Sequence, residues 1–308
     1  MISGRDGDAR PPVAVLIGRV STEDGDRILE TLTRLAQDRD HACEVILVDR
    51  RQDEVSAEIT RRFPAVVLVP CPADETLPAM RALALTHSRA PIVAVTEDHC
   101  VPCEGWLGQI VEAFAADPGL TAVGGPVQNG VFDTGFDWAT FLCEYSFFSP
   151  PVAEGATTVL PGMNVAYRRD ALTAVPASAL SDGFWETTVH QRLLDAGGRF
   201  LSRNRMVMFH CKRFSAGLFL RQRFVYSRYY AGLRFPSRQA AKRAVAAVAS
   251  LALPPVLLFR IVRSCLAKNL RGPLLQALPA LLPIVCVWSI GESWGYVRGP
   301  GRALAEIE

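Results

Sequence analysis

The triplet Glu97-Asp98-His99 stands at the end of the apolar run Pro91–Val95. A short β-branched run without helical periodicity predicts a buried strand of a parallel sheet. Ligands of open α/β sheets bind in the crevice outside the carboxyl ends of such strands. Carboxylate oxygen and imidazole nitrogen both suit a divalent metal of the manganese type. The triplet is therefore a candidate metal site, although the same residues could simply end a strand and cap the next turn.

Three further motifs follow the triplet along the chain. Pro161–Asn164 predicts a tight turn whose backbone can approach a diphosphate closely. Glu186 is expected to open a helix, where a carboxylate suits the helix dipole. His210 ends an alternating run and precedes the basic pair Lys212-Arg213. Each motif alone is ordinary, and it is their order along the chain that indicates a site.

Alternating strands and helices must position these residues. The predicted strands are 13–18, 44–49, 65–69, 91–95, 121–127, a short one within 161–167, and one or two within 200–210. The predicted helices are 24–37, 55–63, 77–88, 106–116, 138–148 and 186–196. Alternation of this kind favours parallel βαβ units in a layered α/β sheet.

Composition narrows the class of protein. The chain has 308 residues, of which 49% are hydrophobic, so a sizeable core is possible and global disorder is excluded. Its start has no apolar signal-peptide region, and its eight cysteines are expected to be reduced thiols in a cytosolic compartment. The pair Cys100-x-x-Cys103 lacks the second such pair of a zinc motif, so a zinc or redox role is the minor interpretation.

The last third of the chain combines basic and apolar character. No acidic residue lies between Asp195 and Glu292, while Arg and Lys recur throughout. This pattern indicates an anionic membrane surface or a phosphate-bearing ligand. Nucleic acid is not expected, because the apolar blocks 244–262 and 274–290 lie in the same stretch. Each block is near the lower limit of about 20 residues for a spanning helix. Spanning helices, a re-entrant hairpin, an interfacial pair and a soluble helical pair all remain open.

The order of motifs resembles the family 2 glycosyltransferases, which have the GT-A fold and use nucleotide-activated sugars. The resemblance runs from Val13 to Arg228 and places Glu97-Asp98-His99 at the family's D-x-D signature. It implies an α/β fold, with a GT-A type nucleotide-sugar-binding mixed sheet flanked by helices and a C-terminal apolar helical hairpin. The implied domains are a catalytic domain 1–215, a basic amphipathic linker 216–243 and membrane-associated helices 244–308.

The resemblance also assigns site residues. It places Glu186 at the position of the catalytic base and gives Mn2+ or Mg2+ to His99 and His210, with Glu97 or Asp98 assisting. Asp49 takes the place of the strand-end residue that contacts the nucleobase. The residues expected to bind the donor are Asp49, Arg81, Glu97, Asp98, Gly162, Met163 and Asn164.

The implied reaction is a hexosyltransferase-like transfer with inversion. Glu186 would take the proton of an acceptor hydroxyl as that oxygen attacks the sugar, and the metal would offset charge on the leaving group. Trp185 could stack on an acceptor ring or pack a loop. Three arginines are candidates to hold a phosphate of the donor or of a lipid carrier: Arg221, Arg223 and Arg228.

The expected partners are a nucleotide-sugar donor, a lipid-linked or glycan acceptor and the membrane, with no nucleic acid. The expected location is the cell membrane, with the catalytic domain on the cytoplasmic side. Basic residues 234–243 before the first apolar block agree with a positive-inside placement. Those at 263–271 do not, which favours a re-entrant or interfacial hairpin.

Two other functions stay open at this point. The chain could be a catalytically degenerate family member that acts as a membrane scaffold. It could also be a structural zinc-binding protein whose ligands are His99, Cys100, Cys103, His210 and Cys211.

Overall fold

The computed structural model describes residues 2, 11–38 and 40–308, which form two compact units. The sheet unit contains the described residues up to Gly130 together with Pro150–Lys212. The helical unit contains Val131–Ser149 and Arg213–Glu308. The expected boundary at residue 215 lies close to the one at 212–213. Residues 131–149, however, fold with the C-terminal helices rather than with the sheet.

An eight-stranded mixed sheet is the centre of the sheet unit. Its strand order is β3-β2-β1-β4-β9-β6-β10-β8. The strands are β1 (Val13–Arg19), β2 (Cys43–Asp49), β3 (Val67–Pro70), β4 (Ile92–Glu97), β6 (Leu120–Gly124), β8 (Gly155–Thr157), β9 (Val165–Arg168) and β10 (Arg199–Ser202). Strands β1 to β4 pair in parallel, and β6 pairs in parallel with β10. Strand β9 runs antiparallel to both neighbours and β8 antiparallel to β10. The layered α/β sheet is therefore confirmed, and its strands are not all parallel.

A second sheet has the order β5-β11-β7, with β5 (Cys100–Pro102), β11 (Met208–His210) and β7 (Val127–Asn129). The sequence predicted one strand over 121–127, but Gly125 and Pro126 divide this segment between the two sheets. A side chain at Gly125 would collide with the backbone carbonyls of Met206 and Arg203. The chain therefore crosses from one sheet to the other at a point where only glycine fits.

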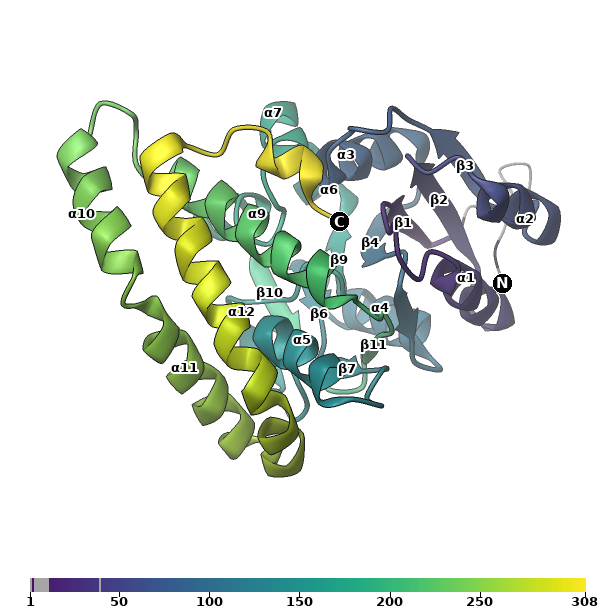
Figure 1. The fold of residues 1–308 in the computed structure, drawn as a ribbon. Helices are drawn as coiled ribbons and strands as arrows, with labels where there is room; N and C mark the ends of the chain where they lie inside the picture. Colours follow the sequence, from purple (N-terminus) through teal and green to yellow (C-terminus); the bar gives the residue numbers. More distant parts are fainter. Residues whose placement is uncertain (1, 3–10, 39) are drawn as a thin grey trace. The chain divides into compact units, whose positions relative to one another are not determined.

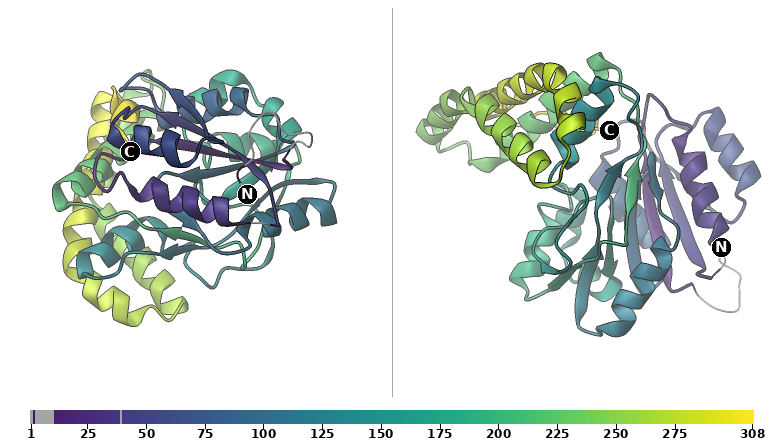
Figure 2. Two further views of the ribbon diagram at one scale, coloured as in Figure 1. Left: turned by 90° about the vertical axis from the view of Figure 1, so that its right-hand side faces the viewer. Right: turned by 90° about the horizontal axis from the view of Figure 1, so that it is seen from below.

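Helices lie on both faces of the larger sheet (Figure 2). They are α1 (Arg27–Gln37), α2 (Glu54–Arg62), α3 (Leu77–His87), α4 (Trp106–Ala116), α6 (Arg169–Thr173), α7 (Ala177–Ser181) and α8 (Val189–Asp195). Thr76 caps α3 by accepting the Ala79 N–H, and Pro78 occupies its first turn, as expected of a helix start. Apolar residues of the strands and helices form a hydrophobic core, in which Leu16 and Val95 of the sheet pack with Met80 and Leu172.

Helix α8 begins at Val189 rather than at Glu186, so the prediction that Glu186 opens a helix is wrong. The hydroxyls of Thr187 and Thr188 both donate to the carbonyl of Phe184, at 3.0 and 2.8 Å. Side-chain bonds of this kind compete with regular helix. Glu186 therefore lies in a turn that precedes the helix.

The helical unit is built around one long helix. Its helices are α5 (Gly135–Tyr145), α9 (Ala216–Arg234), α10 (Ala240–Ser250), α11 (Leu253–Ala267) and α12 (Arg271–Arg298). Helix α12 packs against each of the other four (Figure 1). The expected linker 216–243 is mostly the helix α9, and the first apolar block is divided between α10 and α11, which meet at a bend of 60°.

By length and hydropathy, α12 alone among the described helices could cross a membrane, or two spans are possible if the bent pair α10–α11 counts as one.

Candidate active site

The carboxyl ends of three neighbouring parallel strands meet at one edge of the sheet. Gly18 of β1 pairs with Glu97 of β4, and Arg19 pairs with Asp49 of β2. The turn after β4 then carries Asp98 and His99. The predicted position of the acidic triplet, at the end of a buried strand, is the one observed.

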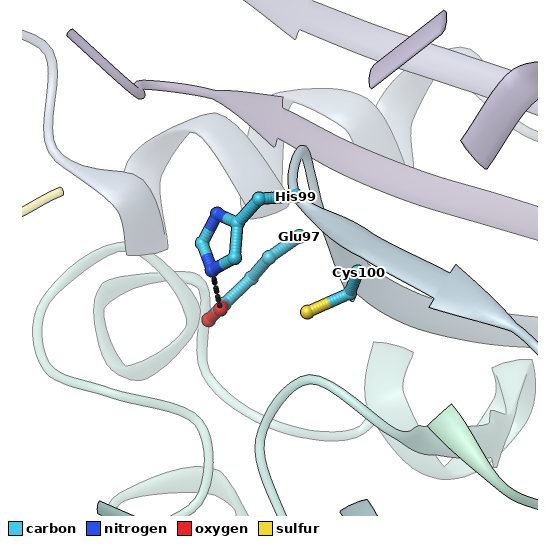
Figure 3. A group of neighbouring side chains, drawn as sticks. All are labelled: Glu97, His99 and Cys100. Carbon is cyan, nitrogen blue, oxygen red and sulfur yellow. Dashed lines mark ion pairs between the residues drawn. The ribbon is translucent and has the colours of Figure 1, made fainter. Parts of the chain in front are cut away.

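Glu97 and His99 point toward one another (Figure 3). Their closest atoms, Glu97 Oε2 and His99 Nε2, lie 3.4 Å apart. The thiol of Cys100 completes a group in which all three possible ligand atoms lie within 4.8 Å of one another. Nitrogen and oxygen donors converge here from a single turn, an arrangement that suits a divalent transition metal.

Asp98 orients the imidazole of His99. Its Oδ1 lies 2.8 Å from His99 Nδ1, and its Oδ2 accepts the backbone N–H groups of Val20 and Ser21, both at 2.8 Å. The Ser21 hydroxyl donates to Oδ1 at 2.7 Å. An ionised carboxylate only accepts hydrogen bonds, so Nδ1 must carry the proton and Nε2 is left facing Glu97. A carboxylate behind the imidazole is the usual support of a metal-binding histidine.

The charged groups of Asp98, Glu97 and His99 shift one another's pKa values. Although burial opposes ionisation, the bonds from His99 and Ser21 and the charge of Lys212 hold the pKa of Asp98 far below its usual value. Burial likewise disfavours the imidazolium, yet Asp98 and Glu97 raise the pKa of His99 to about 9. The two carboxylates therefore stabilise a positive charge on the imidazole of His99.

His210 is brought beside His99 by the smaller sheet. It ends β11 and pairs with Cys100 across the ladder. The rings of His99 and His210 lie 4.7 Å apart between centroids, at an angle of 81°. The backbone N–H of Cys211 also donates to the carbonyl of His99 at 2.9 Å. The two histidines expected to share a metal are therefore neighbours.

Two of the three cysteines of the zinc alternative, Cys103 and Cys211, lie outside the group of possible metal ligands described above. Cys103 Sγ donates to the carbonyl of Arg205 at 3.4 Å, and Cys211 Sγ to that of Phe209 at 3.6 Å. Among the described residues, the group of possible ligands that includes Cys100 contains neither of these thiols, and His210 is not one of its members either. A structural zinc site of five Cys and His ligands is not favoured.

Arg81 lies on α3, and its guanidinium is close to both Glu97 and Glu186. Its side chain is 2% exposed; Nη2 donates to Glu97 Oε1 at 3.3 Å, and Nη1 lies 3.8 Å from Glu186 Oε2. Within the described residues Nη1 has no hydrogen-bond partner. A buried guanidinium with a donor to spare fits the expected role of binding an anionic donor group.

Glu186 lies against the Pro161–Asn164 turn. A Cβ added to Gly162 would stand 2.5 Å from Glu186 Oε2, so only glycine leaves room for this carboxylate. The side chain of Glu186 is 25% exposed, unlike that of Arg81 beneath it. The expected diphosphate turn and the expected base are thus in direct contact, and the side chain of Glu186 is partly exposed although its Oε2 is buried.

If the chain performs the sugar transfer that the resemblance implies, we expect Gly162→Ala to lower its turnover on the order of 10²-fold, because the methyl group displaces the carboxylate of Glu186. Nucleotide binding and thermal stability should change little. Gly217→Ala is the matched control, since a Cβ there meets nothing within 4 Å. Unchanged turnover in Gly162→Ala would contradict this geometry.

Both polar atoms of the Asn164 side chain are hydrogen-bonded to other groups of the protein. Its Oδ1 accepts the indole N–H of Trp106 at 2.8 Å, and its Nδ2 donates to the carbonyls of Pro126 and Met206 at 3.0 and 2.7 Å. Asn164 is fully buried and Met163 nearly so. The Asn164 side chain thus fixes the turn that presents Gly162, and the expected contact of Asn164 with the donor stays a prediction.

Asn164→Ala should destabilise the fold by about 1–3 kcal/mol for each buried group left without a partner. The groups concerned are the Trp106 N–H and two carbonyls. Urea unfolding of the variant beside the parent checks this. Asn164→Asp should be destabilised as well, because it places a carboxylate oxygen against those carbonyls. An unfolding midpoint that stays constant in both variants would contradict the assignment.

Asp49 is also occupied by protein groups. Arg19 Nη1 lies 3.3 Å from its Oδ1, the Ser56 hydroxyl donates to its Oδ2 at 2.5 Å, and the Arg51 N–H donates to Oδ1 at 2.8 Å. Asp49 is 1% exposed. The carboxylate therefore holds the loop after β2 in place, and its expected contact with a nucleobase stays a prediction.

Trp185 cannot stack on an acceptor. It is fully buried, and its indole N–H donates to the carbonyl of Leu180 at 2.7 Å. Of the two roles considered for Trp185, packing is the one that the structure supports.

The three candidate phosphate-binding arginines, all on α9, are engaged within the helical unit. Arg221 pairs with Glu306 at 3.0 Å, and Arg228 donates to the carbonyl of Gly299 at 3.2 Å. Arg223 is buried in an ion pair with Glu144, with aromatic rings of Phe219, Tyr226 and Trp288 around its guanidinium. They anchor the C-terminal segment and α5, and their phosphate-binding role stays a prediction.

No role was predicted for Ser21, and none for Lys212 beyond membership of the basic pair after His210. Lys212 is 3% exposed, and its ammonium donates to the Ser21 hydroxyl at 3.2 Å. Each residue lies two positions after a strand that ends at the site, β1 or β11, and that position was the available signal.

Comparison with known proteins agrees with this geometry. A family model described as "Glycosyl transferase family 2" matches residues 21–175. Among solved structures, the chain is similar to the mannosyltransferase PcManGT from Pyrobaculum calidifontis in complex with GDP-Man and Mn2+, with a TM-score of 0.51 and 19% identity. That match covers 94% of this chain and 87% of the other. No curated relative matches the chain in sequence. The likeness in structure confirms the predicted GT-A type of fold.

Proposed function

Because the chain belongs to glycosyl transferase family 2 and is a glycosyltransferase, we propose that it moves a sugar with inversion from a nucleotide-sugar donor to an acceptor hydroxyl. The observation that carries this proposal is the position of Arg81 between Glu97 and Glu186. One buried guanidinium links the metal side of the site to the carboxylate that would take the proton.

The proposed donor side is formed by Glu97, His99 and His210. Their oxygen and nitrogen donors, with Asp98 supporting the first histidine, fit Mn2+ or Mg2+. When bound, such an ion offsets negative charge that develops on the departing diphosphate. The similar mannosyltransferase binds GDP-Man and Mn2+, so manganese and guanosine nucleotides are the first candidates.

The proposed acceptor side is Glu186. Its carboxylate accepts the proton of the acceptor hydroxyl as that oxygen attacks the anomeric carbon from the face opposite to the leaving group. Arg81 holds the carboxylate in place, and Gly162 leaves the space that it needs. Attack from the opposite face inverts the configuration at that carbon.

We further propose a lipid-linked or glycan acceptor at the cell membrane, with the sheet unit on the cytoplasmic side where nucleotide sugars occur. The apolar helix α12 and the acid-free stretch between Asp195 and Glu292 support this location.

The test is thermal unfolding of the purified protein against a panel of nucleoside diphosphates, with and without manganese. A ligand that binds only the folded state adds about 2.7 kcal/mol at 100 times its dissociation constant. A manganese-dependent stabilisation by one nucleotide supports the donor site and names its base. No stabilisation by any nucleotide would favour the catalytically inactive scaffold.

A further inference from the structure

Three helices of the helical unit expose large apolar side chains. On each helix these residues recur at intervals close to whole helical turns, so that they form a stripe. Between 45% and 71% of each residue is exposed. The stripes contain Val245 and Val248 on α10 with Leu251 directly after it, Val256, Phe259 and Leu266 on α11, and Leu275, Leu282, Ile290, Trp294 and Val297 on α12. Exposed apolar residues gathered in this way mark an interaction site.

Helix α12 is long enough to span a bilayer, but it does not stand free. Any side chain at Gly291 or Gly295 would collide with the backbone of α9, and one at Gly135 of α5 would collide with the backbone of Gln276. Backbones this close hold α12 against α5 and α9 along much of its length. Helix α9 carries charged residues, among them Arg221 and Arg228. Each such charge would cost about 2.5–3.5 kcal/mol or more at the centre of a bilayer, so the packing of α12 opposes a spanning position.

Helices α10 and α11 are too short to cross alone. They have 11 and 15 residues, which corresponds to about 16 and 22 Å at 1.5 Å per residue, whereas the hydrocarbon core is about 30 Å thick. Their axes meet at 60°. Exposed Arg260 and Arg263 also interrupt the apolar surface of α11.

The charge of these helices indicates which kind of surface they bind. The exposed charged residues of α10 to α12 are basic, among them Lys242, Arg260, Arg263, Arg271 and Arg298. No acidic residue lies on α10 or α11. Helices α10 and α11, with Lys and Arg beside Val, Leu and Phe, have the amphipathic pattern that binds in the plane of an anionic membrane, whereas α12 is apolar on its buried face as well.

We propose that the stripes of α10, α11 and α12 form one monotopic surface that lies in the interface of an anionic phospholipid bilayer without crossing it. This inference rests on the membrane location given in the proposed function and deepens it, because it names the lipid class, the residues and the mode of attachment.

Flotation of the full chain with preformed vesicles tests the proposal. We expect the protein to float with vesicles that contain phosphatidylglycerol and to float much less with pure phosphatidylcholine. Phe259→Gln should weaken partitioning about tenfold or more, because the aromatic ring no longer enters the interface. Phe132→Gln is the matched control, since Phe132 is 59% exposed, close to the 64% of Phe259, but lies outside the stripes. Equal flotation of both variants would overturn the proposal.

Two further readouts separate the remaining outcomes. In sealed vesicles with the sheet unit outside, trypsin should still cut at Lys268 and Arg271 between α11 and α12, whereas protection of this turn would show a spanning hairpin. A dimer in size-exclusion chromatography that Phe259→Gln dissolves would show that a second copy covers the stripes. Nucleotide-dependent stabilisation, measured on the same samples, reports on the donor site alone, so failure of lipid binding is distinguishable from failure of the proposed function.

Discussion

The Glu186→Gln variant is expected to lose sugar transfer almost completely while it still binds nucleoside diphosphate. Glutamine keeps the shape of the side chain but cannot accept a proton from the acceptor hydroxyl. General-base catalysis typically contributes about 10²–10⁴-fold to a rate, so the loss should fall in or above this range. Donor binding should persist, because Glu97, His99 and His210 are unchanged.

The measurement is release of nucleoside diphosphate from a set of sugar derivatives of the nucleotide that the thermal panel identifies, with a membrane lipid extract as the source of acceptor. Glu54→Gln is the matched control, since Glu54 is exposed in the first turn of α2. Parent-like turnover in Glu186→Gln would remove Glu186 from the mechanism. Parallel loss of turnover and of nucleotide binding would instead indicate damage to the donor site through Arg81.

The His99→Ala variant is expected to lose the manganese-dependent stabilisation by nucleotide. Removing the imidazole deletes the Nε2 atom that faces Glu97 at 3.4 Å and takes one of its hydrogen-bond partners from the carboxylate of Asp98. At 100 times the dissociation constant of the parent, the lost stabilisation amounts to about 2.7 kcal/mol. Thermal unfolding with nucleotide, with and without manganese, measures it directly.

The His87→Ala variant is the control, because His87 ends α3 away from the acidic triplet. Asp98→Asn adds a second test of the same site: it should weaken manganese-dependent stabilisation less than His99→Ala, since the imidazole remains but loses its ionised support. A full manganese response in His99→Ala would assign the metal to other residues.

Local patterns predicted the strands of the site and the order of its motifs. The apolar run before Glu97 could only be a buried strand, and its carboxyl end is where the triplet lies. Helix α4, predicted over 106–116, has those bounds in the structure. Such features depend on residues near one another in the chain, and a sequence shows these.

Partners distant in sequence explain what the motifs could not show. A carboxylate at the end of a strand looks the same whether it awaits a ligand or, like Asp49, already pairs with Arg19, 30 residues earlier. Asn164 likewise resembles a donor ligand until Trp106 and Met206 occupy its amide. The antiparallel course of β9 depends on pairing with β4, more than 60 residues before it, which no local pattern specifies.

The sheet unit is formed by two segments of the chain, of which one ends at Gly130 and the other runs from Pro150 to Lys212. A protein shortened at Lys212 would therefore keep α5 but lose α12, against which α5 packs. Apolar residues of α5 are buried in the full chain, among them Phe141 and Leu142, and we expect the loss of a packing partner of this helix to promote aggregation. Truncation of the chain after Lys212 therefore does not produce the sheet unit by itself. A fragment that carries the catalytic residues alone requires excision of residues 131–149 as well, with a new peptide link between Gly130 and Pro150.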